Sequence, residues 1–220
     1  MFDVQQLDQY ELGVGPYTHC VWHHSLTEDG VRLNDYASIL KYHTNVYGWR
    51  TIGYNIIIER DGALGKVVAK WGRPLGMQGA HCSSARRNFN AVGICFVGDY
   101  DIDSGETLTQ EHFEVAREVI LAIECALGTT LIHERHNLHA TYKTCPGSAF
   151  PFKELINYIT AAPLNYKDVS ADAWYHDAVL FNIKHRLMVG DGDTFRPDEP
   201  MTRAEQAQVN YNLLKALGKV

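Results

Sequence analysis

Two histidine-bearing segments and one cysteine draw attention in this 220-residue sequence because imidazole and thiolate are donors that zinc prefers. The first segment is Trp22-His23-His24-Ser25, and the second runs from His136 to Cys145. Two imidazoles and one thiolate leave the fourth tetrahedral position open to water, as in catalytic zinc sites. Pro146-Gly147 favours a turn directly after Cys145, so one loop can bring His136 and Cys145 to one ion.

The sequence leaves several choices of ligand open. Neighbouring residues of a strand point to opposite faces, so His23 and His24 should not both enter one site. His133 and His139 compete with His136 for the second position. The alternative interpretations are a surface histidine for His136 and a small buried apolar residue for Cys145.

Strands and helices must position these groups. Apolar runs rich in β-branched residues predict strands at residues 20–23, 54–58, 66–71, 91–97 and 129–133. Helical periodicity predicts one helix capped by Asn34 and ending at Gly48, and another capped by Thr109 and ending at Gly128. Strands that alternate with helices predict an α/β domain, with a mixed central sheet flanked by helices, over residues 1–160.

The C-terminal tail has a different pattern, with helical segments and no predicted strands. Residues 161–165 read as a linker, and residues 166–220 as a small helical hairpin. Val179, Ile183 and Leu187 mark its first helix, and Thr202 with Glu205 forms a capping box that opens the second. Asp191 and Asp193 lie in a turn that lacks the ligand pattern of a calcium-binding EF-hand loop.

Composition excludes several classes of protein. Twenty Lys and Arg against 26 Asp and Glu give a net charge of -6, which argues against nucleic acid as a partner. No apolar run approaches the roughly 20 residues of a membrane helix. The first residues lack a signal peptide, so we expect synthesis in the cytoplasm. Five cysteines, an odd number, suit reduced thiols or a metal ligand better than a disulfide framework.

At these motifs, residues 17–160 resemble the zinc amidases that cut N-acetylmuramoyl-L-alanine bonds, a family shared by amidase-type phage lysozymes and peptidoglycan recognition proteins. The motifs that carry the resemblance are Val21-Trp22-His23-His24-Ser25, Gly53-Tyr54-Asn55-Ile56-Ile57-Ile58, Gly79-Ala80-His81, Asn90-Ala91-Val92-Gly93-Ile94, Glu134-Arg135-His136 and Thr144-Cys145-Pro146-Gly147. The resemblance implies Zn²⁺ bound by His23, His136 and Cys145. It also implies catalytic roles for Tyr54 and Lys143, and a substrate groove lined by His81 and Asn90.

This sequence departs from the family's pattern at two places. The interval from His136 to Cys145 is one residue longer than the commonest spacing. Cys95 stands where some members carry a glutamate base, which leaves Tyr54 and Lys143 as the polar helpers.

Residues 166–214 resemble one surface-layer homology motif, through Asp168-Val169, Trp174-Tyr175, Leu187-Met188-Val189-Gly190, Phe195-Arg196-Pro197-Asp198 and Thr202-Arg203-Ala204-Glu205. Such motifs anchor proteins to anionic secondary cell-wall polysaccharide of Gram-positive envelopes, and Arg203 can grip an anionic sugar substituent bidentately. Because three copies commonly build one binding unit, a single copy raises the possibility of a homotrimer. A helical hairpin that merely buttresses the enzyme is the alternative.

Together the two resemblances imply a phage or prophage endolysin, made without a signal peptide, that acts at the bacterial cell wall. The alternatives are a peptidoglycan-binding module with structural zinc, a host autolysin, and a structural protein of the surface layer.

Overall fold

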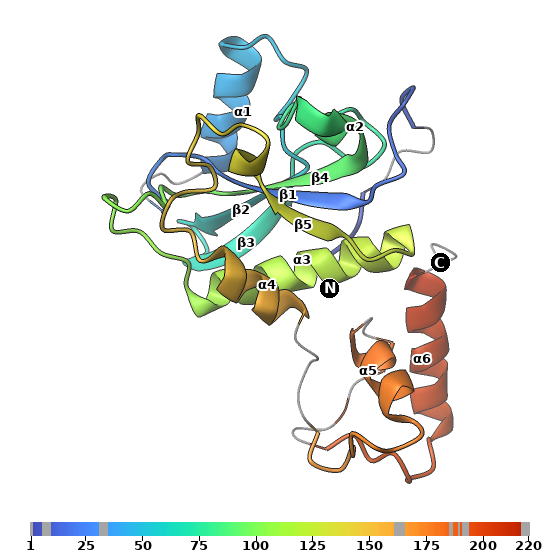
Figure 1. The fold of residues 1–220 in the computed structure, drawn as a ribbon. Coiled ribbons are helices and arrows are strands. Elements are labelled where there is room, and N and C mark those ends of the chain that lie inside the picture. Colours follow the sequence, from blue (N-terminus) through green and yellow to red (C-terminus); the bar gives the residue numbers. More distant parts are fainter. Residues whose placement is uncertain are drawn as a thin grey trace. The chain divides into compact units, whose positions relative to one another are not determined.

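Five strands form one mixed sheet in the computed structural model, which describes residues 2–5, 10–30, 35–160, 166–184, 187–188, 190 and 194–216. The strand order is β3-β2-β4-β1-β5 (Figure 1). The strands are β1 (His19–His24), β2 (Ile56–Asp61), β3 (Lys66–Trp71), β4 (Ala91–Phe96) and β5 (Ile132–Arg135). β1 pairs in parallel with β4 and β5, β2 pairs in parallel with β4, and β3 is antiparallel to β2. The expected α/β class with a mixed sheet is confirmed.

The helices are α1 (Asp35–Asn45), α2 (Arg87–Asn90), α3 (Gln110–Leu127), α4 (Phe152–Thr160), α5 (His176–Lys184) and α6 (Arg203–Ala216). Two short 3-10 turns, Ser84–Arg86 and His136–Leu138, precede α2 and follow β5. Among the described residues, no helix is both long enough and apolar enough to cross a bilayer.

Most predicted element boundaries shift by a few residues. β2 begins at Ile56 rather than at residue 54, because the Asn55 side chain accepts from the Gly93 amide and donates to the Arg73 carbonyl. The strand predicted at 129–133 is Ile132–Arg135, since the turn at Gly128 delays pairing until the Ile132 amide reaches the Thr18 carbonyl. α1 ends at Asn45, before Tyr47, and its proposed cap Asn34 lies outside the described residues.

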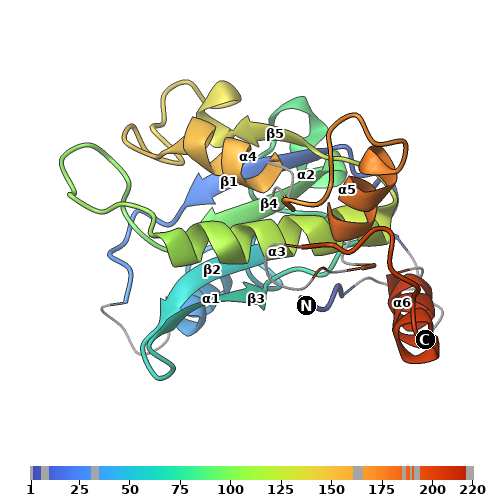
Figure 2. The ribbon, with the colours of Figure 1, turned by 90° about the horizontal axis from the view of Figure 1, so that it is seen from below.

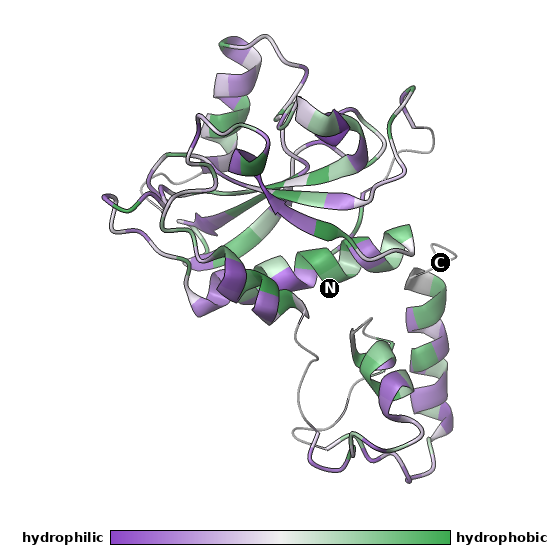
Figure 3. Cartoon of the chain, viewed as in Figure 1, coloured by the Kyte–Doolittle hydropathy of each residue, from purple (hydrophilic) through white to green (hydrophobic). Residues whose placement is uncertain are grey.

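Side chains alternate between the two faces of the sheet. His23, Cys95 and Ile57 lie in register on neighbouring strands, and Ile57 and Cys95 belong to the cluster against which α1 packs. On the opposite face, Trp22 stacks on Phe96 with ring centroids 5.7 Å apart, and Phe96 contacts His112 of α3. Figure 2 shows α3 lying across this second face. α3 shows apolar positions interrupted by polar ones (Figure 3), as expected of an amphipathic helix that covers a sheet with one face.

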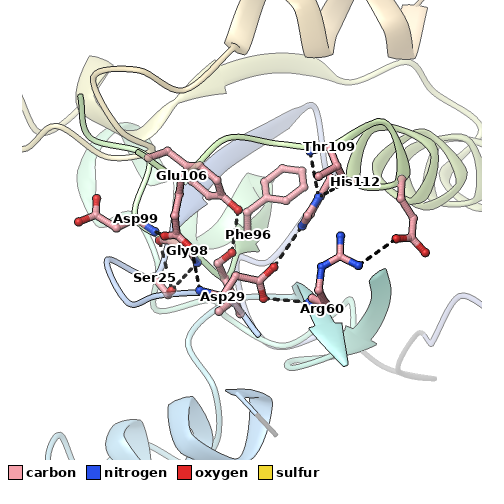
Figure 4. Close-up of polar contacts among 12 residues, drawn as sticks. Ser25, Asp29, Arg60, Phe96, Gly98, Asp99, Glu106, Thr109 and His112 are labelled. Atoms are coloured by element: carbon pink, nitrogen blue, oxygen red, sulfur yellow. Dashed lines mark hydrogen bonds and ion pairs between the residues drawn. The ribbon is translucent and has the colours of Figure 1, made fainter. Parts of the chain in front are cut away.

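A polar network secures the loop that follows β1 (Figure 4). Asp29 accepts from the Arg60 amide at 2.9 Å and lies 3.3 Å from His112 Nε2. Glu106 accepts from the backbone amides of Asp29 and Asp99, and the Ser25 hydroxyl accepts from the Gly98 amide. These bonds tie the loop to β2, α3 and the segment after β4. They therefore hold the chain in place directly after the carboxyl end of β1, where His23 lies.

The chain divides into two compact units, residues 1–120 with 129–159 and residues 121–128 with 160–220. In the second unit Tyr166, Val179 and Ile183 form a small buried cluster. Asp168 accepts from the Phe195 and Arg196 amides. The expected capping box is present: the Thr202 hydroxyl accepts from the Glu205 amide at 3.2 Å, and the Glu205 carboxylate accepts from the Thr202 amide at 2.7 Å.

The tail differs from the prediction at the end of α5, and two of its predicted features lie outside the described residues. α5 ends at Lys184, so the buried Leu187 lies beyond the helix that was predicted to include it. The linker at residues 161–165 and the turn at Asp191 and Asp193 lie outside the described residues.

Candidate active site

His23 is placed by the central strand of the sheet. β1 lies between β4 and β5, and His23 is 1% exposed on the face that α1 covers. The next residue, His24, turns away, and its Nδ1 accepts from the Tyr100 amide at 3.4 Å. The alternation of a strand therefore brings His23, and not His24, to the other candidate ligands.

His136 and Cys145 are placed by one closed loop. His136 begins the 3-10 turn after β5, and its carbonyl accepts from the amides of His139 and Ala140. The Asn137 amide donates to the Cys145 carbonyl at 2.8 Å, which returns the chain to its starting point. Thr144 and Ser148, on either side of Cys145, donate to the Asp101 carboxylate at 2.8 Å. The loop is thus held by hydrogen bonds between its own residues and by hydrogen bonds to Asp101.

The three side chains converge. One ligand atom from each of His23, His136 and Cys145 lies within 4.8 Å of the others, and no other such group of His, Cys, Asp or Glu occurs in the described part of the chain. Cys145 Sγ is 3.6 Å from His23 Nδ1. A tetrahedral zinc with bonds of about 2.05 Å to nitrogen and about 2.3 Å to sulfur separates these two atoms by about 3.6 Å. The donor set and spacing fit zinc.

The competing histidines have other partners. The Trp22 indole donates to His133 Nδ1 at 3.2 Å, and the His139 Nε2 atom lies 2.8 Å from Glu134. Glu134 also receives two bonds from the Arg87 guanidinium, which lowers the pKa of the carboxyl to about 2 against the opposing effect of burial. These contacts hold His133 and His139 on the strand and loop beside the cluster.

Burial sets the protonation of the cluster. It lowers the pKa of His23 well below the usual value and, with the nearby Lys143 charge, lowers the pKa of His136 to about 4. Both imidazoles are therefore neutral at pH 7 and have lone pairs for a metal. Burial raises the pKa of the Cys145 thiol to about 11, against a backbone hydrogen bond from His24 and the Lys143 charge. A bound cation favours the thiolate and opposes that shift.

Tyr54 and Lys143 flank the cluster. The Tyr54 ring centroid is 5.0 Å from that of His23, and Tyr54 precedes β2. Burial and the neighbouring Cys95 and Cys145 sulfurs raise the pKa of Tyr54 well above its usual value, so its hydroxyl is a proton donor at neutral pH. Lys143 is exposed and lines the same groove as Tyr54 and Cys145.

The cluster lies in a groove of about 1260 Å³. α1 and the loop after it contribute Tyr42, Tyr47 and Trp49, here called the aromatic wall. The loop from His136 to Cys145, here called the ligand loop, contributes Tyr142 and Lys143. The Tyr47 and Trp49 rings stack at 4.9 Å, yet Tyr47 remains 52% exposed. The sequence interpretation did not include this aromatic wall, although the close spacing of Tyr42, Tyr47 and Trp49 offered a signal.

Three predicted binding residues have different surroundings. His81 lines the groove but is buried and contacts His23, with His81 Nδ1 3.1 Å from His23 Nε2. Asn90 ends α2, where its side chain accepts from Arg87, and it is not among the residues that line the groove. Arg203 is the first residue of α6 and is exposed in the second unit. The structure therefore does not bring Asn90 to the groove.

A buried arginine, Arg73, links two segments that carry residues of the groove. Arg73 donates from Nε to the Ile52 carbonyl at 2.7 Å and from Nη1 to the Gln78 carbonyl at 2.5 Å. Ile52 precedes Tyr54 by two residues, and Gln78 precedes His81 by three. One guanidinium thus joins the two segments that carry Tyr54 and His81.

Known proteins resemble both parts of the chain. Residues 14–148 match the family model described as N-acetylmuramoyl-L-alanine amidase, and residues 165–207 match the S-layer homology domain. The endolysin of Escherichia phage T7 is 26% identical over 144 residues, which are 64% of this chain and 85% of that protein. The amidase LysC of Clostridium intestinale has a similar fold, with a TM-score of 0.53 and 22% identity, over 70% of this chain and 95% of that one.

Other relatives match over shorter parts of their own length. Peptidoglycan-recognition protein SC1a of Drosophila melanogaster is 33% identical over 103 residues, 44% of this chain and 52% of that protein. The Surface-layer 125 kDa protein of Lysinibacillus sphaericus is 40% identical over 57 residues, 26% of this chain and 5% of that protein. The matched stretch thus spans about half of the recognition protein and a small part of the surface-layer protein. The family model covers more than half of this chain, which therefore belongs to the N-acetylmuramoyl-L-alanine amidase family and carries an S-layer homology domain.

Proposed function

We propose that this protein is a zinc-dependent hydrolase that cleaves the amide bond between N-acetylmuramic acid and L-alanine of peptidoglycan. The observation that carries the proposal is the convergence of His23, His136 and Cys145 within 4.8 Å in a groove lined by Tyr54 and Lys143. Membership of the amidase family supports the choice of bond.

His23, His136 and Cys145 would hold the metal. When bound, zinc supplies a Lewis acid for the amide carbonyl and lowers the pKa of water to about 7. The two imidazoles serve as neutral donors, and the thiolate supplies the negative charge of the site. The groove walls hold the substrate, and the low exposure of the three ligand side chains strengthens their electrostatic interaction with charges that develop in the groove.

Tyr54 and Lys143 act on the reacting amide. As a nucleophilic oxygen attacks the carbonyl carbon, negative charge develops on the carbonyl oxygen. The Tyr54 hydroxyl and the Lys143 ammonium donate hydrogen bonds to that charge or deliver a proton to the leaving nitrogen. Preorganised donors of this kind contribute about 3 kcal/mol each to the stability of the transition state.

The aromatic wall suits a glycan substrate. Tyr42 and Tyr47 of this wall, and Tyr142 of the ligand loop, are at least half exposed along the groove. Flat exposed rings can pack against the apolar faces of sugar rings. The S-layer homology domain supports a second contact, with anionic secondary cell-wall polysaccharide of a Gram-positive wall, through Arg203. We assign residues 1–160 to the amidase domain and residues 166–220 to the wall-binding motif. We propose that the enzyme acts at the cell wall as an endolysin.

Cleavage of defined muropeptides tests the proposal. Purified zinc-loaded protein should release free L-alanine amino termini and intact N-acetylmuramic acid, both identified by mass spectrometry. The alternative, a module that binds peptidoglycan without cutting it, is favoured by the similarity to recognition proteins. It predicts binding of the same muropeptides with no new ends, and that result would replace hydrolysis as the function.

A further inference from the structure

The buried contact between His23 and His81 has a direction that matters for zinc. His23 Nε2 and His81 Nδ1 are 3.1 Å apart, and both side chains are less than 10% exposed. A hydrogen bond between two neutral imidazoles needs one nitrogen that carries a proton and one that does not. Two arrangements are therefore possible, and they leave His23 Nδ1 in opposite states.

Only one arrangement leaves His23 able to bind a metal through the nitrogen that faces Cys145. If His81 donated, a neutral His23 would carry its proton on Nδ1, the atom 3.6 Å from Cys145 Sγ, and that nitrogen would have no lone pair. If His23 donates from Nε2, Nδ1 is free. The proton of His81 then sits on Nε2, a buried atom for which the structure shows no hydrogen-bond partner among the described residues.

The surroundings of His81 fix its ring. The backbone amides of His81 and Cys82 both donate to the Asn88 side chain, at 2.9 Å and 2.8 Å. A methyl group on Gly93 would lie 2.5 Å from the His81 ring, and one on Gly79 would lie 2.8 Å from it. The absence of side chains at these two glycines makes the space in which the imidazole fits.

We infer that His81 is a positioning residue: it accepts a hydrogen bond from His23 Nε2 and thereby holds His23 in the tautomer whose Nδ1 binds zinc. This inference rests on the proposed function and assigns His81 a role different from the substrate contact expected from sequence. Metal-binding histidines commonly donate their second ring N–H to a fixed acceptor, and loss of that acceptor typically weakens metal affinity about 10- to 100-fold.

Two substitutions at position 81 separate the acceptor from the ring. His81→Asn places an amide oxygen near the position of Nδ1 and keeps an acceptor, whereas His81→Leu fills a similar space without one. We expect His81→Leu to weaken zinc affinity, measured by competition with a chelator, about 10- to 100-fold. His81→Asn should recover most of that affinity. His112→Leu is the control, because His112 is another buried histidine and bonds Thr109 and Asp29 instead.

Nuclear magnetic resonance gives a readout independent of turnover. Long-range ¹H–¹⁵N spectra of the zinc-loaded protein should show His23 protonated at Nε2 and His81 protonated at Nε2. A spectrum with His81 protonated at Nδ1 would overturn the inference. Circular dichroism checks that each variant is folded.

The outcomes also separate this inference from the proposed function. Wild-type protein without zinc affinity would remove the proposed function itself. Wild-type protein that binds zinc, together with His81→Leu protein that binds it equally well and shows only a raised KM, would make His81 a substrate contact. Equal losses in His81→Leu and His81→Asn would show that the acceptor is not what matters.

Discussion

Cys145 supplies the negative charge of the proposed zinc site. Its Sγ atom is 3.6 Å from His23 Nδ1, the separation expected of two ligands of one tetrahedral zinc ion. Cys145→Ala should therefore reduce the zinc content from about one ion per chain to almost none, because two neutral imidazoles bind zinc weakly alone. The fold should persist, since the sheet and its helices make the core. Elemental analysis measures the zinc, and circular dichroism the fold.

His139→Ala is the matched control for this test. It removes an imidazole from the same loop but takes away a contact with Glu134 rather than a ligand. Zinc should stay bound in this variant and should be lost from His136→Ala. The reverse pattern would mean that the second ligand is wrongly assigned.

Tyr54 offers a second test at the scale of one side chain. Tyr54→Phe removes only the hydroxyl, so zinc content and muropeptide binding should remain. The rate constant kcat should fall by about 100-fold or more, as expected when one transition-state donor is lost. Steady-state kinetics on a soluble muropeptide, with zinc content measured on the same sample, decides the matter. Normal turnover by the zinc-loaded variant would remove Tyr54 from the mechanism.

At the scale of elements, the segment after β4 holds the ligand loop in place. Asp101→Ala removes the acceptor of both Thr144 and Ser148, so the loop that carries Cys145 should sample more positions. We expect zinc affinity to fall by about 10-fold, the size typical of losing a group that orients a ligand. Chelator competition measures this affinity. Asp103→Ala, an exposed residue of the same segment, is the control and should bind zinc as the wild type does.

Sequence patterns predicted those parts of the fold and site that depend on local chemistry. The strand Lys66–Trp71 was predicted with its observed bounds, and α3 ends before Gly128, whose φ of 63° suits glycine. The alternation of β1 separated His23 from His24, as period two requires. Spacing could not decide among His133, His136 and His139, because the bond from Trp22 to His133 joins two different strands and His139 reaches back to Glu134 only through the folding of its loop.

Other features depend on contacts between distant segments. The start of β2 was predicted two residues early, since Asn55 binds Gly93 and Arg73 through its side chain. His81 meets His23 across 58 residues of sequence, so no local pattern indicates their hydrogen bond. The aromatic wall combines Tyr42 of α1 with Tyr47 and Trp49 of the segment after it, and their place in the groove depends on how α1 packs on the sheet.

At the scale of the whole molecule, every proposed catalytic group precedes the S-layer homology domain. Protein that ends at Pro163 should therefore cleave soluble muropeptides at a rate similar to that of the full chain. Its activity on intact walls should fall, because the anchor no longer raises the local concentration of enzyme. Turbidity of wall suspensions and release of soluble products measure the two activities. Equal wall binding by both proteins would favour the buttress interpretation of the tail.

Arg203 tests the anchor without truncation. Thr202 and Glu205 are occupied with each other in the capping box, whereas the exposed Arg203 guanidinium has five N–H donors for an anionic sugar substituent. Arg203→Ala should weaken sedimentation with polysaccharide-bearing walls and leave soluble turnover unchanged. Unchanged sedimentation would exclude Arg203 from the contact.

The loop from His136 to Cys145 contributes two of the three proposed ligands, and β1 contributes the third. A bound ion would therefore fasten a surface loop to the centre of the sheet, in the manner of a cross-link that can be removed. Ligands that bind only the native arrangement stabilise it by mass action. Chelation should accordingly expose this loop to proteases before the rest of the amidase domain unfolds. Limited proteolysis would then nick the chain between residues 136 and 146, and added zinc would protect it.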